Sequence, residues 1–67
     1  MTDKQMGELW REHGGGDPLR HHNCIICRLI RKLVEERVKH YGIIGAPEGE
    51  APLEAALFDF NIDPGTW

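Results

Sequence analysis

A broad apolar stripe with helical spacing runs through the middle of the chain and limits the folds available to it. Its members recur at intervals of three and four residues, which places them on one face of a helix. They are Ile26, Ile30, Leu33, Val34, Val38 and Tyr41. The stripe is too wide for one short amphipathic helix to leave in water. We expect it to form either the protein core or the interface of a homodimer whose two copies pack face to face.

The predicted central helix covers residues 17–41. Asp17 is a favourable N-cap and Pro18 suits the first helical position, although Asn23 offers an alternative start. Gly42 is the expected stop, because glycine readily adopts the left-handed conformation that ends many helices.

A shorter helix is predicted at the N-terminus, over residues 1–13. Thr2 and Gln5 are three residues apart and have the form of a capping box. The apolar side chains that follow share one helical face. The three glycines at positions 14–16 end this helix, as a hinge or a tight turn.

The C-terminal part divides into a linker, residues 46–52, and an acidic aromatic arm, residues 53–67. Pro52 suits the start of a helical turn or two. Apolar side chains at 58, 60 and 62 then alternate with polar ones, which predicts an extended segment. Asp63, Pro64 and Gly65 are typical of a turn. The complete pattern predicts an all-α miniprotein, a single small domain over residues 1–67 with a thin core.

Charge is unevenly distributed along the chain, whose net charge is −3. All eight lysines and arginines lie in residues 1–41, whereas residues 42–67 carry five acids and no base. This acidic balance argues against nucleic-acid binding, which usually needs a basic surplus. Arg37 falls inside the apolar stripe. Its stem is expected either to reach outward or to pair with an acid from the tail or from a second chain.

The segment from His21 to Cys27 is the strongest candidate for site chemistry. Cys24 and Cys27 have the spacing of half a structural zinc site, and His21 or His22 could add a third ligand. Such a site would be local, with His13 folding back to it, or shared between two chains. The alternatives are that the cysteines are core thiols or that they carry redox chemistry. A thioredoxin-like role is not favoured, because no βαβ pattern surrounds the motif.

Several function classes are disfavoured by what the sequence contains. It has no serine, and so short a chain offers little material for a water-excluding pocket, so an enzyme is not expected. No stretch approaches the ~20 apolar residues of a membrane span. The first fifteen residues do not resemble a secretory signal, so the cytoplasm is the expected compartment, where cysteines normally stay reduced.

The arm is the predicted binding element, because large apolar side chains stand in a strongly acidic segment. Aromatic anchors are frequent at binding hot spots, and an extended arm can add to a partner's sheet edge. The residues concerned are Leu57, Phe58, Asp59, Phe60, Ile62, Asp63 and Trp67. Alternatively, these side chains fold back and complete the chain's own core.

The predicted function is non-catalytic binding to a larger protein, as a regulator, an inhibitor or an assembly factor. A phage-type modulator of a host machine would have this size. The alternatives are a zinc-stapled nucleic-acid-binding regulator and a small subunit of an enzyme assembly.

Overall fold

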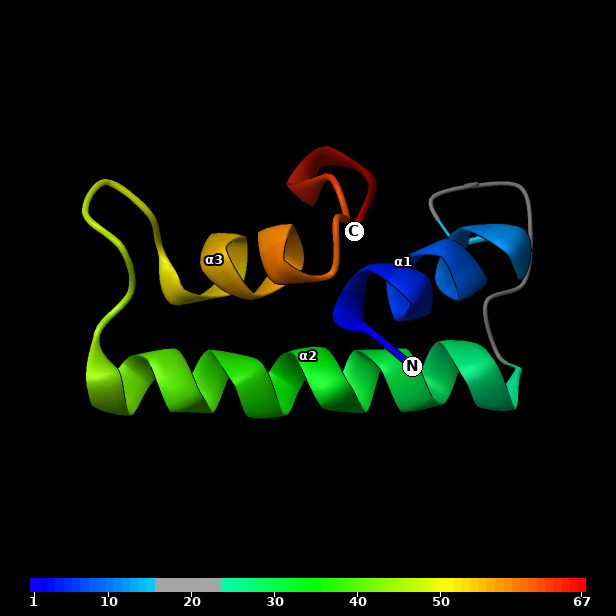
Figure 1. Ribbon diagram of the computed structural model, residues 1–67, viewed down its shortest axis with the longest axis horizontal. Coiled ribbons are helices and arrows are strands. Elements are labelled where there is room, and N and C mark those ends of the chain that lie inside the picture. The colour runs from blue at the N-terminus through cyan, green and yellow to red at the C-terminus, as the bar shows by residue number, and fades with distance from the viewer. Residues whose placement is uncertain (16–23) are drawn as a thin grey trace.

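A computed structural model describes residues 1–15 and 24–67, and in these two ranges the chain forms three α-helices and a short 3-10 turn. Their bounds are Asp3–Glu12 for α1, Ile25–Ile44 for α2, Pro52–Asp59 for α3 and Pro64–Thr66 for η1. Helix α2 forms one layer, and α1 and α3 lie end to end along one side of it (Figure 1). The all-α prediction, with a short first helix and a long central helix, is confirmed. None of the described helices is long and apolar enough to cross a membrane.

Local hydrogen bonds define both ends of α1. The Thr2 hydroxyl accepts the Gln5 N–H at 3.2 Å, and the Gln5 side chain accepts the Thr2 N–H at 2.7 Å. This is the predicted capping box. At the other end Gly14 has a φ of +89°, and the Gly15 N–H donates to the Trp10 carbonyl at 2.7 Å. These bonds form a Schellman motif, so the described part of the glycine segment is a tight turn.

Helix α2 continues beyond its predicted end. The predicted start, at residues 17–23, lies outside the described residues, and the helix begins at Ile25. The predicted stop at Gly42 is wrong, because the helix passes through this residue and ends at Gly45, whose φ is +89°. A glycine inside a helix costs only about 1 kcal/mol relative to alanine. The helix can therefore pass one glycine and end at the next, which adopts a backbone conformation that other residues rarely take.

The arm is helical from Pro52 to Asp59, and this helix reaches into the segment that was predicted to be extended. Pro52 occupies the first turn of α3, as predicted. The extended segment predicted from the alternation of Phe58, Phe60 and Ile62 is wrong. Phe58 lies within α3, and the other two lie in and after the turn that ends the helix. The alternation arises where a helix ends and the chain reverses, so it does not mark a strand.

A second Schellman motif makes this reversal. Asn61 has a φ of +56°, and the Ile62 N–H donates to the Leu57 carbonyl at 2.9 Å. This bond joins the backbones of two residues whose side chains are both buried in the core, as is usual for the apolar pair of the motif. The predicted turn then follows, with the Asp63 carboxylate accepting the Gly65 N–H at 2.9 Å. The motif thus directs the end of the chain back toward the core.

The core lies between the two layers. Helix α2 contributes side chains from its inner face, α1 contributes one large aromatic, and the arm contributes the rest. The buried apolar residues are Trp10, Cys27, Ile30, Val34, Ala55, Ala56, Leu57, Phe60 and Ile62. More than half of them come from the arm, so the arm is an integral part of the fold.

Candidate functional site

The aromatic and aliphatic arm residues predicted to bind a partner fall into two groups. Leu57, Phe60 and Ile62 are at most 2% exposed and belong to the core. Phe58 and Trp67 are 49% and 39% exposed. Only these last two can meet a partner without unfolding of the arm.

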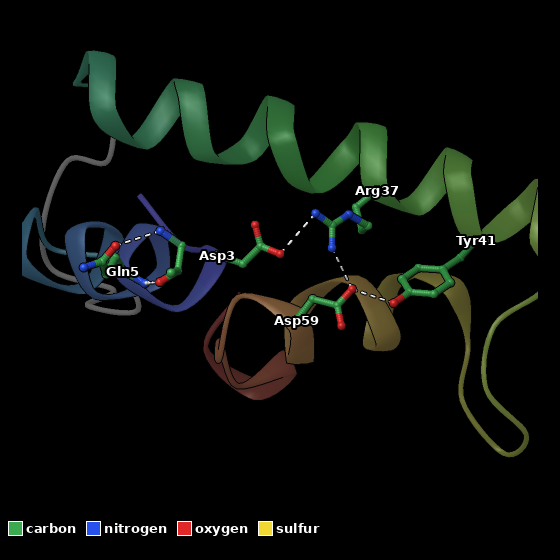
Figure 2. A network of polar contacts seen from close by, with 6 residues as sticks. Asp3, Gln5, Arg37, Tyr41 and Asp59 are labelled. Atoms are coloured by element: carbon green, nitrogen blue, oxygen red, sulfur yellow. Dashed lines mark hydrogen bonds and ion pairs between the residues drawn. The ribbon is translucent and has the colours of Figure 1, made fainter.

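Asp59 of the arm interacts with two residues of α2. The Asp59 carboxylate accepts hydrogen bonds from the Arg37 guanidinium at 2.9 Å and from the Tyr41 hydroxyl at 2.5 Å (Figure 2). The same guanidinium pairs with Asp3 of α1 at 3.2 Å and lies 5.3 Å from the centre of the Phe60 ring. Of the alternatives expected for Arg37, the structure shows the pairing with an acid of the tail, together with Asp3 of α1. Figure 2 shows how this one side chain joins all three helices.

Two pKa values change because of these contacts. The hydrogen bond to Asp59 raises the pKa of Tyr41, because loss of the hydroxyl proton would set two negative oxygens against each other. The hydrogen bond to Asp59, and that to Asp3, raise the pKa of Arg37. Both groups therefore keep their protons at neutral pH, as these hydrogen bonds require.

The apolar stripe of α2 faces the other helices of the same chain. Ile30 and Val34 are fully buried, and the remaining members pack against the core while keeping some exposure. These are Ile26, Leu33, Val38 and Tyr41. Helices α1 and α3 therefore supply most of the cover that a second copy would otherwise provide.

A groove of about 570 Å³ remains where the cover of α2 is incomplete. Its apolar surface comes from α2, from the start of α3 and from the last residue of the chain, namely Val34, Val38, Leu53 and Trp67. A charged row of Arg31, Glu35 and Lys39, spaced four residues apart along α2, lines its side. These three residues were not among the predicted site residues. The signal that could have found two of them is that Arg31 and Glu35 each lie three residues before a groove valine, Val34 and Val38 respectively.

Trp67 is held in place by a second tryptophan. Its ring centre lies 5.6 Å from that of Trp10, with an angle of 35° between the planes, and Trp10 is itself buried. A second, smaller hollow of about 370 Å³ includes Trp10 in its lining. It is lined by Trp10, Arg11, Phe58, Asn61, Ile62, Asp63 and Thr66.

The Cys-x-x-Cys motif forms the first turn of α2. Cys24 is the N-cap, and its Sγ accepts the Cys27 N–H at 3.3 Å. Cys27 is buried, and its Sγ lies 3.8 Å from the carbonyl oxygen of His13. Hydrogen bonds from the Cys27 backbone and thiol lower the pKa of Cys24. Burial, and then the interaction with the Cys24 sulfur, raise the pKa of Cys27.

The predicted zinc ligands are only partly within the described residues. The structure brings Cys24 and Cys27 together, whereas His21 and His22 lie in the segment it does not describe. Across residues 1–15 and 24–67, no three His, Cys, Asp or Glu side chains are grouped so that they could hold a metal ion. Two thiols are half of a zinc site, so structural zinc stays a prediction.

Two features of the described residues offer chemistry outside the packing of the core. The groove beside α2 presents apolar surface bounded by charge, and the first turn of the same helix presents two sulfurs of unequal exposure. Comparisons of the chain with protein-family models, with curated proteins and with solved structures find no match.

Proposed function

We propose that this chain is a non-catalytic protein-binding module whose groove beside α2 holds an amphipathic helical segment of a larger partner protein. The observation that carries the proposal is the placement of Trp67, which lines the groove while its ring packs against Trp10. Tryptophan is enriched among the residues that dominate binding energy. An aromatic side chain that is already held in position loses little conformational freedom when a partner binds.

The size and the lining of the groove support this occupant. Its volume of about 570 Å³ lies within the range of roughly 300–1,000 Å³ that is usual for binding pockets. Val34 and Val38 are one helical turn apart, and Leu53 and Trp67 provide apolar surface from other parts of the chain. A partner helix fits such a groove through apolar residues repeated at three- and four-residue intervals.

The charges beside the groove indicate which side chains should flank the apolar residues of the partner helix. Arg31 and Lys39 stand against a single acid, Glu35, so the row has a positive balance. A partner segment carrying aspartate or glutamate beside its apolar residues would be favoured. Nucleic acid would gain little from the apolar floor and would meet Glu35 in the middle of the row. The proposed role is that of a regulator, inhibitor or assembly factor in the cytoplasm, where free thiols such as Cys24 and Cys27 remain reduced.

A random peptide display library tests the proposal for a partner of any sequence. The purified chain is immobilised, and the enriched peptides are expected to combine apolar anchors at helical spacing with acidic flanks. Leu53→Glu should abolish retention of these peptides, because Leu53 is 44% exposed and lines the groove. Glutamate suits the first turn of α3, so this variant should still fold. Ile43→Glu is the matched control, since Ile43 is 85% exposed and does not line the groove.

Two further measurements separate the alternatives. Chemical-shift changes on peptide binding should centre on Val38 and Trp67. Equal retention of the peptides by Leu53→Glu and Ile43→Glu would contradict the proposal. Sedimentation velocity of the free chain tests for homodimers, because self-association that Leu53→Glu removes would make a second copy the occupant. Binding to nucleic acid that is lost steeply with rising salt would indicate phosphate contacts and favour the nucleic-acid-binding alternative.

A further inference from the structure

We infer that Cys24 and Cys27 form a dithiol site that exchanges with disulfides, with Cys24 as the attacking thiol and Cys27 as the resolving thiol. The substrate class is a disulfide, either a small molecule such as oxidised glutathione or a disulfide of another protein. This site lies at the first turn of α2, whereas the groove begins at Arg31. The inference is therefore independent of the proposed binding function.

The geometry of the helix start brings the two sulfurs together. Positions three apart on a helix are neighbours, and a disulfide needs Cα atoms about 4.4–6.8 Å apart. Cys24 is the N-cap with an extended backbone, and its Sγ already accepts the Cys27 N–H at 3.3 Å. Its sulfur therefore lies over the residue with which it would bond.

The surroundings of the two sulfurs assign their roles. Cys24 is half-buried, and its Sγ accepts the Cys27 N–H at the start of the helix. Cys27 is completely buried and its Sγ faces the His13 carbonyl oxygen at 3.8 Å. A disulfide in solution can reach only the first sulfur, so the second reacts after a bond has formed at the first.

The exchange balances without any further reactant. The Cys24 thiolate attacks one sulfur of the disulfide, the sulfur–sulfur bond of the substrate breaks, and one thiolate leaves with the proton that Cys24 released. Cys27 then loses its proton to the second leaving thiolate and attacks the Cys24 sulfur of the mixed disulfide. The two protein thiols are oxidised to one disulfide, and the substrate disulfide is reduced to two thiols.

The test is equilibration of the reduced full-length chain with buffers of reduced and oxidised glutathione, followed by acid quenching and intact mass measurement. The wild-type chain should lose the mass of two hydrogens and should retain no glutathione. Cys27→Ala should stop at the mixed disulfide on Cys24. Cys24→Ala should remain unmodified while folded, because its remaining thiol is buried. Far-UV circular dichroism verifies that both variants are helical.

A second measurement needs no variant. Limiting N-ethylmaleimide on the native wild-type chain should label Cys24 at least tenfold faster than Cys27. Trypsin can release both residues in one peptide, because Arg20 and Arg28 flank them, and fragmentation of that peptide locates the label. Equal labelling rates would overturn the inference, as would a wild-type chain that stays reduced or accumulates stable glutathione adducts. Zinc bound by the isolated chain through both cysteines, and released only by chelation, would also overturn it.

Discussion

Helix α1 and the C-terminal arm both pack on α2, but they do so by different means. Helix α1 buries one large side chain, Trp10, and comes so close to the arm that a Cβ at Gly7 would overlap the Phe60 carbonyl oxygen. The arm buries five apolar residues, from Ala55 to Ile62. Because hydrophobic stabilisation follows the apolar area removed from water, the arm contributes the larger share.

The comparison shows that two neighbouring elements can pack on the same helix through different properties of their residues. Helix α1 depends on shape, since its fit needs a position with no side chain. The arm depends on the amount of apolar surface that it buries. Arg37 serves both, because its guanidinium pairs with Asp3 of α1 and with Asp59 of α3.

The largest expected effect is at Phe60. Phe60→Ala should destabilise the fold by about 3–5 kcal/mol, since the side chain is 2% exposed and its loss leaves a cavity. A core of this size provides only a few kcal/mol of stability, so the variant should be largely unfolded at room temperature. Urea unfolding followed by circular dichroism measures the effect. Phe58→Ala is the matched control and should change stability by less than about 1 kcal/mol, because Phe58 is exposed. Equal losses would contradict the placement of Phe60, and not Phe58, in the core.

A pair of glycine variants tests the close approach of α1 to the arm. Gly7→Ala should destabilise by about 1–3 kcal/mol, because the new methyl group meets backbone that cannot easily move. Gly42→Ala should stabilise by about 0.5–1 kcal/mol, because this helical position has open space around it. Thermal unfolding should show midpoints displaced in opposite directions. Displacements of the same sign would mean that α1 does not contact the arm at Gly7.

Neutralising Asp59 and Asp3 in turn compares the two ion pairs of Arg37. Asp59→Asn should cost about 1–2 kcal/mol, because Asp59 binds both Arg37 and Tyr41, although partial exposure of the pair weakens its effect. Asp3→Asn should cost less than about 1 kcal/mol, as is usual for an exposed pair. A double-mutant cycle with Arg37→Met isolates each interaction. Equal coupling energies would show that the pair of Arg37 with Asp3 of α1 stabilises the fold as much as its pair with Asp59 of the arm.

The smallest expected effect is a loss of stability at alkaline pH, where Tyr41 loses its proton. Because folding raises the pKa of Tyr41, its contribution to stability is complete below the unfolded value of about 10 and is lost as pH rises through the folded value. Urea midpoints of the wild type should therefore fall more steeply than those of Tyr41→Phe as the pH rises above about 10. Identical profiles would mean that the bond from Tyr41 to Asp59 does not contribute to attachment of the arm.

Sequence reasoning succeeded where neighbouring residues decide the structure. The Thr2–Gln5 capping box, the proline at the start of α3 and the turn at Asp63 depend on contacts within a few residues. It failed at the end of α2, where two glycines compete, and at Phe58 to Ile62, where a chain reversal resembles the alternation of a strand. Both errors arise because the same short pattern suits two backbone conformations, and distant packing selects between them.

The candidate sites were less predictable than the fold. The Cys-x-x-Cys motif was evident, but Cys27 is buried where its Sγ meets the His13 carbonyl oxygen at the end of α1, and this contact between distant residues could not be predicted. The groove combines residues from α2, the start of α3 and the end of the chain. No local pattern indicates that Leu53 and Trp67 line the same groove as Val38, because the proximity of distant residues depends on how the helices pack.

The sequence by itself determined that the chain is helical, where its capping residues lie and which face of α2 avoids water. Backbone hydrogen bonding, capping and periodicity act over a few residues, so each can be recognised in isolation. Tertiary structure alone decided that the arm covers that face, that Arg37 pairs with Asp59, and that Trp67 rests on Trp10. The apolar arm gains more by burial against α2 than by remaining in water, and this gain depends on surface area and shape rather than on any motif.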